Sequence, residues 1–193
     1  MLVTIRQSGF SLVELLIGIA LLGILMAFGI PSFQGWLQNA QIRTAAESVQ
    51  NGIQVTRNEA VKDNGRARFV LCGLPASSWE VLAVSPTAAA PVASLACGAG
   101  SNAAAGEIRV QERSSQEGSR LAQVVLTPNG ASTITFNSLG RVVANADASA
   151  SITQIDVSTP TGDRPLRITV GAGGNIRMCD PSPNLAASDP RHC

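Results

Sequence analysis

One apolar run near the N-terminus constrains this chain more than any other feature of its sequence. Residues 10–30 read FSLVELLIGIALLGILMAFGI and carry a single charged side chain, that of Glu14. As a helix, the run would be about 31 Å long, the thickness of one bilayer core. A carboxylate within a membrane costs about 2.5–3.5 kcal/mol unless it is paired. The nearest basic residue, Arg6, precedes the run, so we expect the partner of Glu14 to come from elsewhere.

The residues alone leave three interpretations of this run open. A cleaved secretory signal would use Ala27-Phe28-Gly29 as its small-x-small site, with Glu14 inside its apolar region. A plain membrane anchor would have the right length but would leave Glu14 without a role. A short leader, residues 1–9, would be removed by a cut after Gly9 and would place Glu14 close to the new N-terminus.

The helical pattern continues beyond the apolar run. Apolar or small residues recur close to helical spacing at Phe33, Leu37, Ala40, Ala45, Val49, Ile53, Ala60 and Val61. Asn64-Gly65 then supplies a helix stop signal. We therefore expect one helix over residues 10–64, loosened at Pro31, whose second half packs on the core of its own domain.

From Arg66 onward the hydrophobic period changes to that of β-strands. The runs that predict strands are RARFVLCGL, SSWEVLAVS, GEIRVQER, AQVVLTP, STITFNSLGRVV, SITQIDVS, PLRITV and NIRMCD. The last two flank a Gly-rich turn and predict a hairpin. We expect an α+β fold in which the long N-terminal helix packs on an antiparallel β domain. Trp36 and Trp79 are expected in its core.

Composition argues against several classes of protein. The formal net charge is +1, so no global basic field attracts nucleic acid. His192 is the sole histidine, and no serine stands in a G-x-S-x-G elbow. The stretch Gly171–Gly174 lacks the helix start and the Lys-Ser/Thr pair of a phosphate-binding loop. We expect no enzyme, no cofactor and no metal site.

The cysteines point to an oxidising compartment. Cys72, Cys97, Cys179 and Cys193 are scattered, and none lies in a C-x-x-C pair, which disfavours zinc. With an N-terminal export-type segment, two disulfides are the better interpretation. Cys72–Cys97 with Cys179–Cys193 is the most local pairing, and the two other connectivities stay open.

Two sets of residues carry a resemblance to a known family. The stretch Gly9-Phe10-Ser11-Leu12-Val13-Glu14 resembles the cleavage and methylation signature of type IV pilins and pseudopilins. More loosely, FNSLGRV, the PLRITVGAGGNIRMC hairpin and the cysteine-closed tail resemble the GspH/FimT group of minor pilins. The resemblance implies a pilin-like fold and a subunit of a type IV pilus or a type II secretion pseudopilus.

The resemblance also implies how such a chain is processed. A prepilin peptidase would cut after Gly9 and methylate the amine of Phe10, and that amine would pair with Glu14 of a neighbouring subunit.

The resemblance also implies how the chain is divided. The implied parts are a leader (1–9), a transmembrane and assembly helix (10–30), a periplasmic half-helix beginning at Pro31 (31–65) and a β-rich domain (66–193). The implied location is the bacterial inner membrane, crossed once, with the domain in the periplasm. The implied partners are other pilins, the peptidase, the assembly platform and membrane lipid.

A rival function from a different class is DNA capture for natural transformation. Some minor pilins of this group carry a basic G-R-x-R motif that contacts DNA. The matching stretch here, Gly174-Asn175-Ile176-Arg177, keeps one arginine of the two. The further candidates for a basic patch are Arg164, Arg167 and Arg191, with Asp163, Asp180 and Asp189 close by in sequence. So few arginines predict weak, salt-sensitive binding, and DNA is not favoured.

Overall fold

The computed structural model describes residues 11–84, 106–186 and 188–193. The chain forms two compact units, residues 1–37 and residues 38–193, and one helix contributes to both. That helix is α1 (Leu12–Lys62). The strands that follow are β1 (Arg66–Cys72), β2 (Ser78–Val84), β3 (Glu107–Arg113), β4 (Gln123–Thr127), β5 (Thr133–Phe136), β6 (Val142–Val143), β7 (Gln154–Ser158), β8 (Leu166–Val170) and β9 (Ile176–Cys179).

The ends of α1 follow from local sequence. The Ser11 hydroxyl accepts a hydrogen bond from the Glu14 backbone N–H at 3.2 Å, which caps the first turn. At the other end, Asn64 adopts a left-handed φ of 47°, and the Gly65 N–H donates to the Ala60 carbonyl at 3.1 Å. The helix is thus slightly shorter than residues 10–64 at both ends, and it continues through Pro31.

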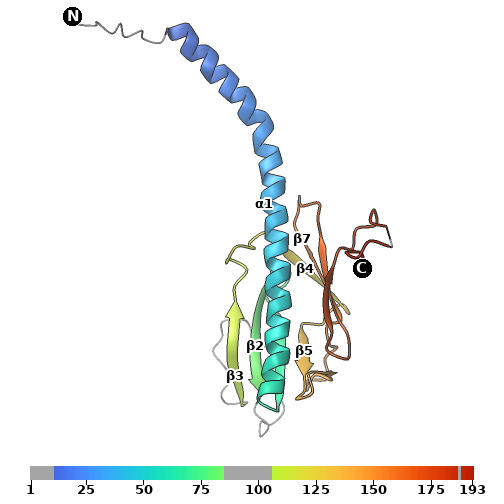
Figure 1. Cartoon of the computed structure of the whole chain (residues 1–193). Helices are drawn as coiled ribbons and strands as arrows, with labels where there is room; N and C mark the ends of the chain where they lie inside the picture. Colours follow the sequence, from blue (N-terminus) through green and yellow to red (C-terminus); the bar gives the residue numbers. More distant parts are fainter. Residues whose placement is uncertain (1–10, 85–105, 187) are drawn as a thin grey trace, which may run out of the picture. The chain divides into compact units, whose positions relative to one another are not determined.

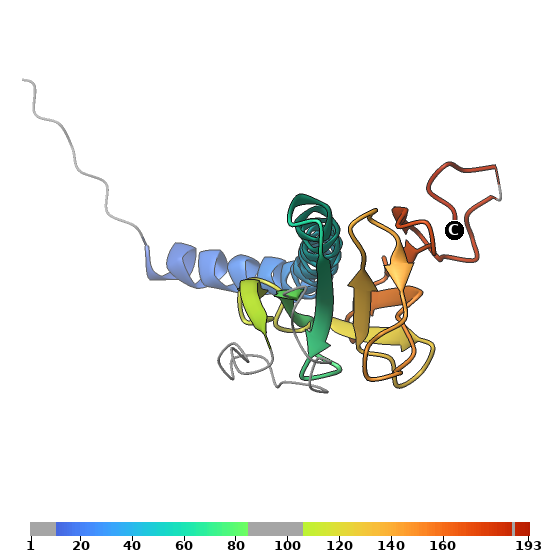
Figure 2. The ribbon, with the colours of Figure 1, turned by 90° about the horizontal axis from the view of Figure 1, so that it is seen from below.

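All strands of the second unit pair antiparallel and form two sheets. One has the order β3-β2-β1-β5-β6 and the other the order β4-β7-β8-β9. The second half of α1 lies along these strands (Figures 1 and 2). Its buried residues join side chains of both sheets in one hydrophobic core: Ile42, Ala45, Ala46, Val49, Ile53 and Ala60. Gly52 permits this packing, because a side chain there would meet the rings of Phe69 and Trp79 at 2.8–3.1 Å.

The predicted apolar stripe of the helix is only partly buried. Ala45, Val49, Ile53 and Ala60 are at most 1% exposed. In contrast, the exposed stripe positions are Phe33, Leu37, Ala40 and Val61. Helical spacing gives the direction of a side chain, but it does not say how far along the helix the sheets extend.

The two tryptophans also differ in burial. Trp79 is 1% exposed and packs against Phe69, with ring centroids 5.8 Å apart. Trp36 is 65% exposed, so its predicted place in the core is wrong. Position 36 belongs to the first unit, which has no sheet among its described residues.

One predicted strand is in fact two. The run STITFNSLGRVV forms β5, a turn at residues 137–141, and β6. The Asn137 side-chain oxygen accepts hydrogen bonds from the N–H groups of Leu139 and Arg141, each at 3.0 Å. Gly140 takes a φ of 68° within this turn. These local bonds reverse the chain where alternation alone predicted a continuous strand.

Candidate functional site

The first turn of α1 holds the acid that the sequence singled out. Glu14 lies three residues after the capping Ser11 and is exposed, as is every described residue from Ser11 to Ala27. In the described part of the chain, no side chain forms an ion pair or hydrogen bond with the Glu14 carboxylate. Gly9 and Phe10 lie outside the described residues.

The surface of α1 around Glu14 is apolar. Leu12, Val13, Leu15 and Leu16 are 58–74% exposed, and the following apolar side chains up to Met26 are exposed as well. A side chain added at Gly18 or Gly23 would meet nothing within 4 Å, so the backbone is open to close approach there. Within the described residues, no helix reaches the combined length and apolarity expected of a membrane span.

Two turns that the sequence singled out separately meet in the structure. The turn at residues 137–141 and the β8–β9 turn approach so closely that a side chain on Gly174 would overlap the Gly140 carbonyl. Arg57 of α1 donates from Nε to the same carbonyl at 3.2 Å. The Val142 N–H donates to the Ala172 carbonyl at 3.1 Å, which joins the two sheets. The softer family motifs thus build one junction at the end of α1.

A cluster of side-chain amides, which the sequence analysis missed, holds the start of the second unit. Gln38 accepts a hydrogen bond from the Thr161 N–H, and Gln41 accepts one from the Leu121 N–H, each at 3.0 Å. Asn39 donates to Asp163 at 2.7 Å and accepts from its N–H at 3.1 Å. One turn of α1 therefore fixes two loops far apart in sequence. The signal was the run Gln-Asn-Ala-Gln, which places three amides, at positions 38, 39 and 41, within one helical turn.

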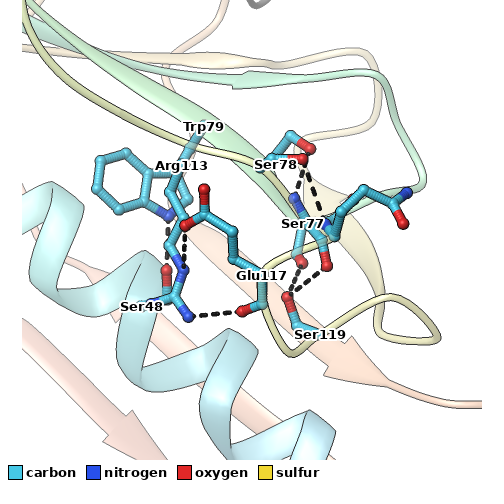
Figure 3. A network of polar contacts seen from close by, with 10 residues as sticks. Ser48, Ser77, Ser78, Trp79, Arg113, Glu117 and Ser119 are labelled. Atoms are coloured by element: carbon cyan, nitrogen blue, oxygen red, sulfur yellow. Dashed lines mark hydrogen bonds and ion pairs between the residues drawn. The ribbon is translucent and has the colours of Figure 1, made fainter.

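A second polar network, also missed, links α1 to the chain between β3 and β4 (Figure 3). The Trp79 indole N–H donates to the Ser48 hydroxyl at 2.8 Å, in a buried setting. Around it, the Ser77 and Ser119 hydroxyls lie 3.1 Å apart, and Arg113 donates to the Glu117 carbonyl at 2.9 Å. The first of these bonds joins the helix to β2, and the second joins the residue before β2 to the β3–β4 connection.

Charged residues are also buried on β1, β2 and β3. Arg68 donates to Glu107 at 2.5 Å, and Arg109 donates to Glu80 at 3.1 Å. One oxygen of each glutamate and the Arg68 Nε have no hydrogen-bond partner in the described structure. Burial raises the pKa of Glu80, and the nearby Arg109 offsets only part of that rise. Such pairs rarely stabilise a fold strongly, because desolvation opposes their attraction.

The C-terminal loop is closed as expected at one end of β9. Cys179 and Cys193 form a disulfide with their Cα atoms 5.1 Å apart. Arg177 donates to the carbonyls of Pro190 and His192, at 3.4 and 2.9 Å. The predicted bond between Cys72 and Cys97 stays a prediction, because Cys97 lies outside the described residues.

The structure does not assemble the candidate arginines into a basic patch. Arg167 binds Asp156 with both arms of its guanidinium, at 2.6 and 3.2 Å. Arg191 binds Asp189 in the same way and lowers the pKa of that carboxyl to about 2. Arg177 faces the backbone of the C-terminal loop. Of the four candidates, Arg164 alone forms no side-chain bond within the described residues. In the part of the chain that the structure describes, no cluster of side chains is suited to a metal ion.

Comparison with known proteins gives two matches to family models. The model described as "Type II transport protein GspH" matches residues 45–174. The model described as "Prokaryotic N-terminal methylation motif" matches residues 4–30. Together they cover α1 from Ala45 onward, the strands up to β8 and the apolar run with Glu14.

Individual relatives are more distant. A fimbrial protein of Moraxella nonliquefaciens is 38% identical over 63 residues, which are 31% of this chain and 38% of that protein. The chain thus spans little more than a third of the length of that curated relative. The type IV minor pilin FimU of Pseudomonas aeruginosa has a TM-score of 0.49 and 12% identity, covering 71% of this chain and 87% of its own. The minor pseudopilin EpsH from the type 2 secretion system of Vibrio cholerae has a TM-score of 0.47 and 15% identity. The match covers 75% of this chain and 98% of the EpsH chain.

Proposed function

Because the chain belongs to the GspH family of type II transport proteins, we propose that it is a non-enzymatic minor subunit of a type IV pilus or a type II secretion pseudopilus. It inserts in the inner membrane through its first helix and carries its β-rich unit in the periplasm. A prepilin peptidase removes residues 1–9 and methylates Phe10. The mature chain then assembles with other pilin-like subunits.

The observation that carries this proposal is Glu14, whose carboxylate has no partner among the described residues. A methylation motif spans residues 4–30, and within it Glu14 stands on the first turn of an exposed apolar helix with no partner in the described chain. A carboxylate in that position is costly in lipid unless a cation reaches it. The amine created at Phe10 by cleavage is such a cation, and a neighbouring subunit brings it within reach.

Pairing of this kind gives assembly its direction. An unpaired Glu14 disfavours the subunit that is free in the membrane, and a pair with Phe10 of the next subunit relieves that cost. The open backbone at Gly18 and Gly23 lets two such helices approach closely. The charge sets the axial register, and helix packing supplies the remaining attraction.

The second unit serves in this proposal as a rigid head. The amides of Gln38, Asn39 and Gln41 fix two loops to the helix where that unit begins, and Arg57 binds the turn at Gly140 near the end of the helix. A load on α1 is thereby passed to both sheets. The paired arginines offer no argument for DNA capture, so we propose no second function.

The test is the mature N-terminus of the full chain expressed with its native membrane machinery. Intact mass and N-terminal sequencing should give a chain that starts at Phe10 and carries one methyl group. The variant Gly9→Val should keep residues 1–9, since cleavage needs the small residue before the cut. A mature chain that starts at Ile30, or an uncut chain from Met1, would contradict the proposal.

A further inference from the structure

The described aromatic rings are either fully buried or more than half exposed. In the second unit, Phe69, Trp79 and Phe136 are at most 1% exposed. In the first unit, Phe33 is 61% exposed and Trp36 is 65% exposed. Large rings left in water are costly, at roughly 25 cal/mol per Å² of apolar area. The exposed pair therefore needs a reason that core packing does not supply.

Phe33 and Trp36 form one surface on α1. They are three residues apart, so they share a helix face, and their ring centroids lie 5.8 Å apart. Leu37 adds to this face at 43% exposure. The Trp36 indole N–H has no hydrogen-bond partner in the described chain, whereas the N–H of Trp79 binds Ser48. The surface is thus apolar with one unused polar donor.

The position of the pair along the chain indicates what covers it. The apolar run ends at Ile30, and the first amide that holds the second unit is Gln38. At 1.5 Å per residue, Phe33 lies about 4–5 Å and Trp36 about 9 Å beyond the end of the run. Side chains on a helix lean back toward its N-terminus, which brings the Trp36 ring several ångströms closer to the run. The headgroup region of a bilayer is about 5–8 Å thick on each side.

We propose that Phe33 and Trp36 anchor the chain in the headgroup region of the periplasmic membrane surface while the subunit awaits assembly. This inference rests on the proposed function, which places residues 10–30 in the bilayer. Tryptophan suits this site because its ring is apolar and its N–H reaches water or lipid carbonyl groups. The pair then fixes the depth of the helix and, with it, the depth of Glu14 at the opposite end of the run.

The test is the fluorescence of the full chain in vesicles of phosphatidylethanolamine and phosphatidylglycerol. The variant Trp36→Phe keeps Trp79 as its single tryptophan. The emission of the unchanged chain minus the emission of this variant therefore gives the signal of Trp36. Because Trp36 is exposed, this variant should fold. Trp79→Phe leaves Trp36 alone and gives the same signal directly, and thermal unfolding checks that this variant is folded.

The expected result combines three observations. The chain floats with the vesicles, and the emission of Trp36 shifts to shorter wavelength relative to the chain in dilute detergent. Lipids brominated near the top of their acyl chains quench Trp36 more than lipids brominated near the chain ends. The signal of Trp79 changes in neither comparison, since that ring is buried.

Other results would overturn the inference in distinguishable ways. A chain that floats while its Trp36 stays open to aqueous iodide and insensitive to brominated lipid leaves membrane insertion intact but removes the anchor. Stronger quenching by the deeply brominated lipid would place the ring in the hydrocarbon and also contradict it. A chain that does not float would contradict both the inference and the membrane insertion on which it rests.

Discussion

Gly174 lies directly against the backbone carbonyl of Gly140, and no side chain fits between them. Gly174 also has a φ of 83°, a conformation that favours glycine. Arg57 binds the same Gly140 carbonyl from α1. The contact therefore joins the helix and the turns of two sheets at a single point, and its loss should affect the whole second unit.

Gly174→Ala should lower the free energy of unfolding by about 2–4 kcal/mol, because it adds a strained φ and an overlap with backbone. Gly173→Ala is the matched control, since a side chain there would meet only Asn175 at 3.9 Å. Thermal unfolding of the full chain in detergent measures both. Equal stability of the two variants would show that the two turns can separate without cost.

Ser48→Ala should destabilise the second unit by about 1–3 kcal/mol, because it leaves the buried Trp79 N–H without an acceptor. Gln54→Ala is a control on an exposed position of the same helix. Urea unfolding followed by Trp79 emission should show a lower midpoint for Ser48→Ala alone. An unchanged midpoint would mean that water replaces the serine hydroxyl.

The elements of the fold were largely predictable because each has a local signal. The alternating pattern marked every strand except β6, which was joined to β5, and helical spacing marked Ala45, Val49 and Ile53 as core. The turn at Asn137 was not predicted, because the whole run was interpreted as one strand although Asn137, Ser138 and Gly140 are residues typical of turns. The exposure of Trp36 was not predicted either, because helical spacing does not show which turns of a helix are packed.

The disulfide and the ion pairs were predictable only where the two partners are close in sequence. The disulfide between Cys179 and Cys193 joins residues close in sequence, and the structure contains it. The pairing of Arg167 with Asp156 depends on the register of β7 against β8, where these residues stand opposite each other. Without that register, Arg167 looked available for a basic patch. The contact of Arg57 with Gly140 is similarly set by tertiary packing.

Cys179→Ser combined with Cys193→Ser should loosen the C-terminal loop. Closing a loop of this size contributes about 3 kcal/mol in chain-entropy terms. The amide protons of Asp180 and Cys193, which bond across the base of the loop, should exchange faster in the variant. Those of β7 should be unchanged. Unchanged exchange at Asp180 would show that Arg177 and the backbone hold the loop without the disulfide.

Glu80→Gln should change how stability depends on pH. The folded pKa of Glu80 is raised above its ordinary value, so between the two values the native state binds more protons than the unfolded state. The free energy of unfolding contributed by Glu80 therefore falls as pH rises through that window. Relative to the unchanged chain, Glu80→Gln should gain stability as the pH rises above 4.5, the ordinary pKa of the carboxyl.

The control for this prediction is Glu117→Gln, which removes an exposed carboxylate that pairs with Arg113 and does not contribute to the pKa shift of Glu80. Urea midpoints at a series of pH values give the comparison, and the slope is the readout rather than the absolute stability. Parallel curves for Glu80→Gln and the unchanged chain would show that burial does not shift this carboxyl.

Glu14→Leu should leave membrane insertion intact or improve it, because it removes the cost of placing a carboxylate in lipid. Incorporation into filaments should fall, since the variant offers no partner for the Phe10 amine of its neighbour. Glu14→Gln keeps the shape and loses the charge, so it should fail to the same degree if pairing is electrostatic. Leu15→Ile, on the adjacent exposed position, should assemble normally. Co-purification with sheared filaments measures all three, and normal assembly of Glu14→Leu would refute pairing between subunits.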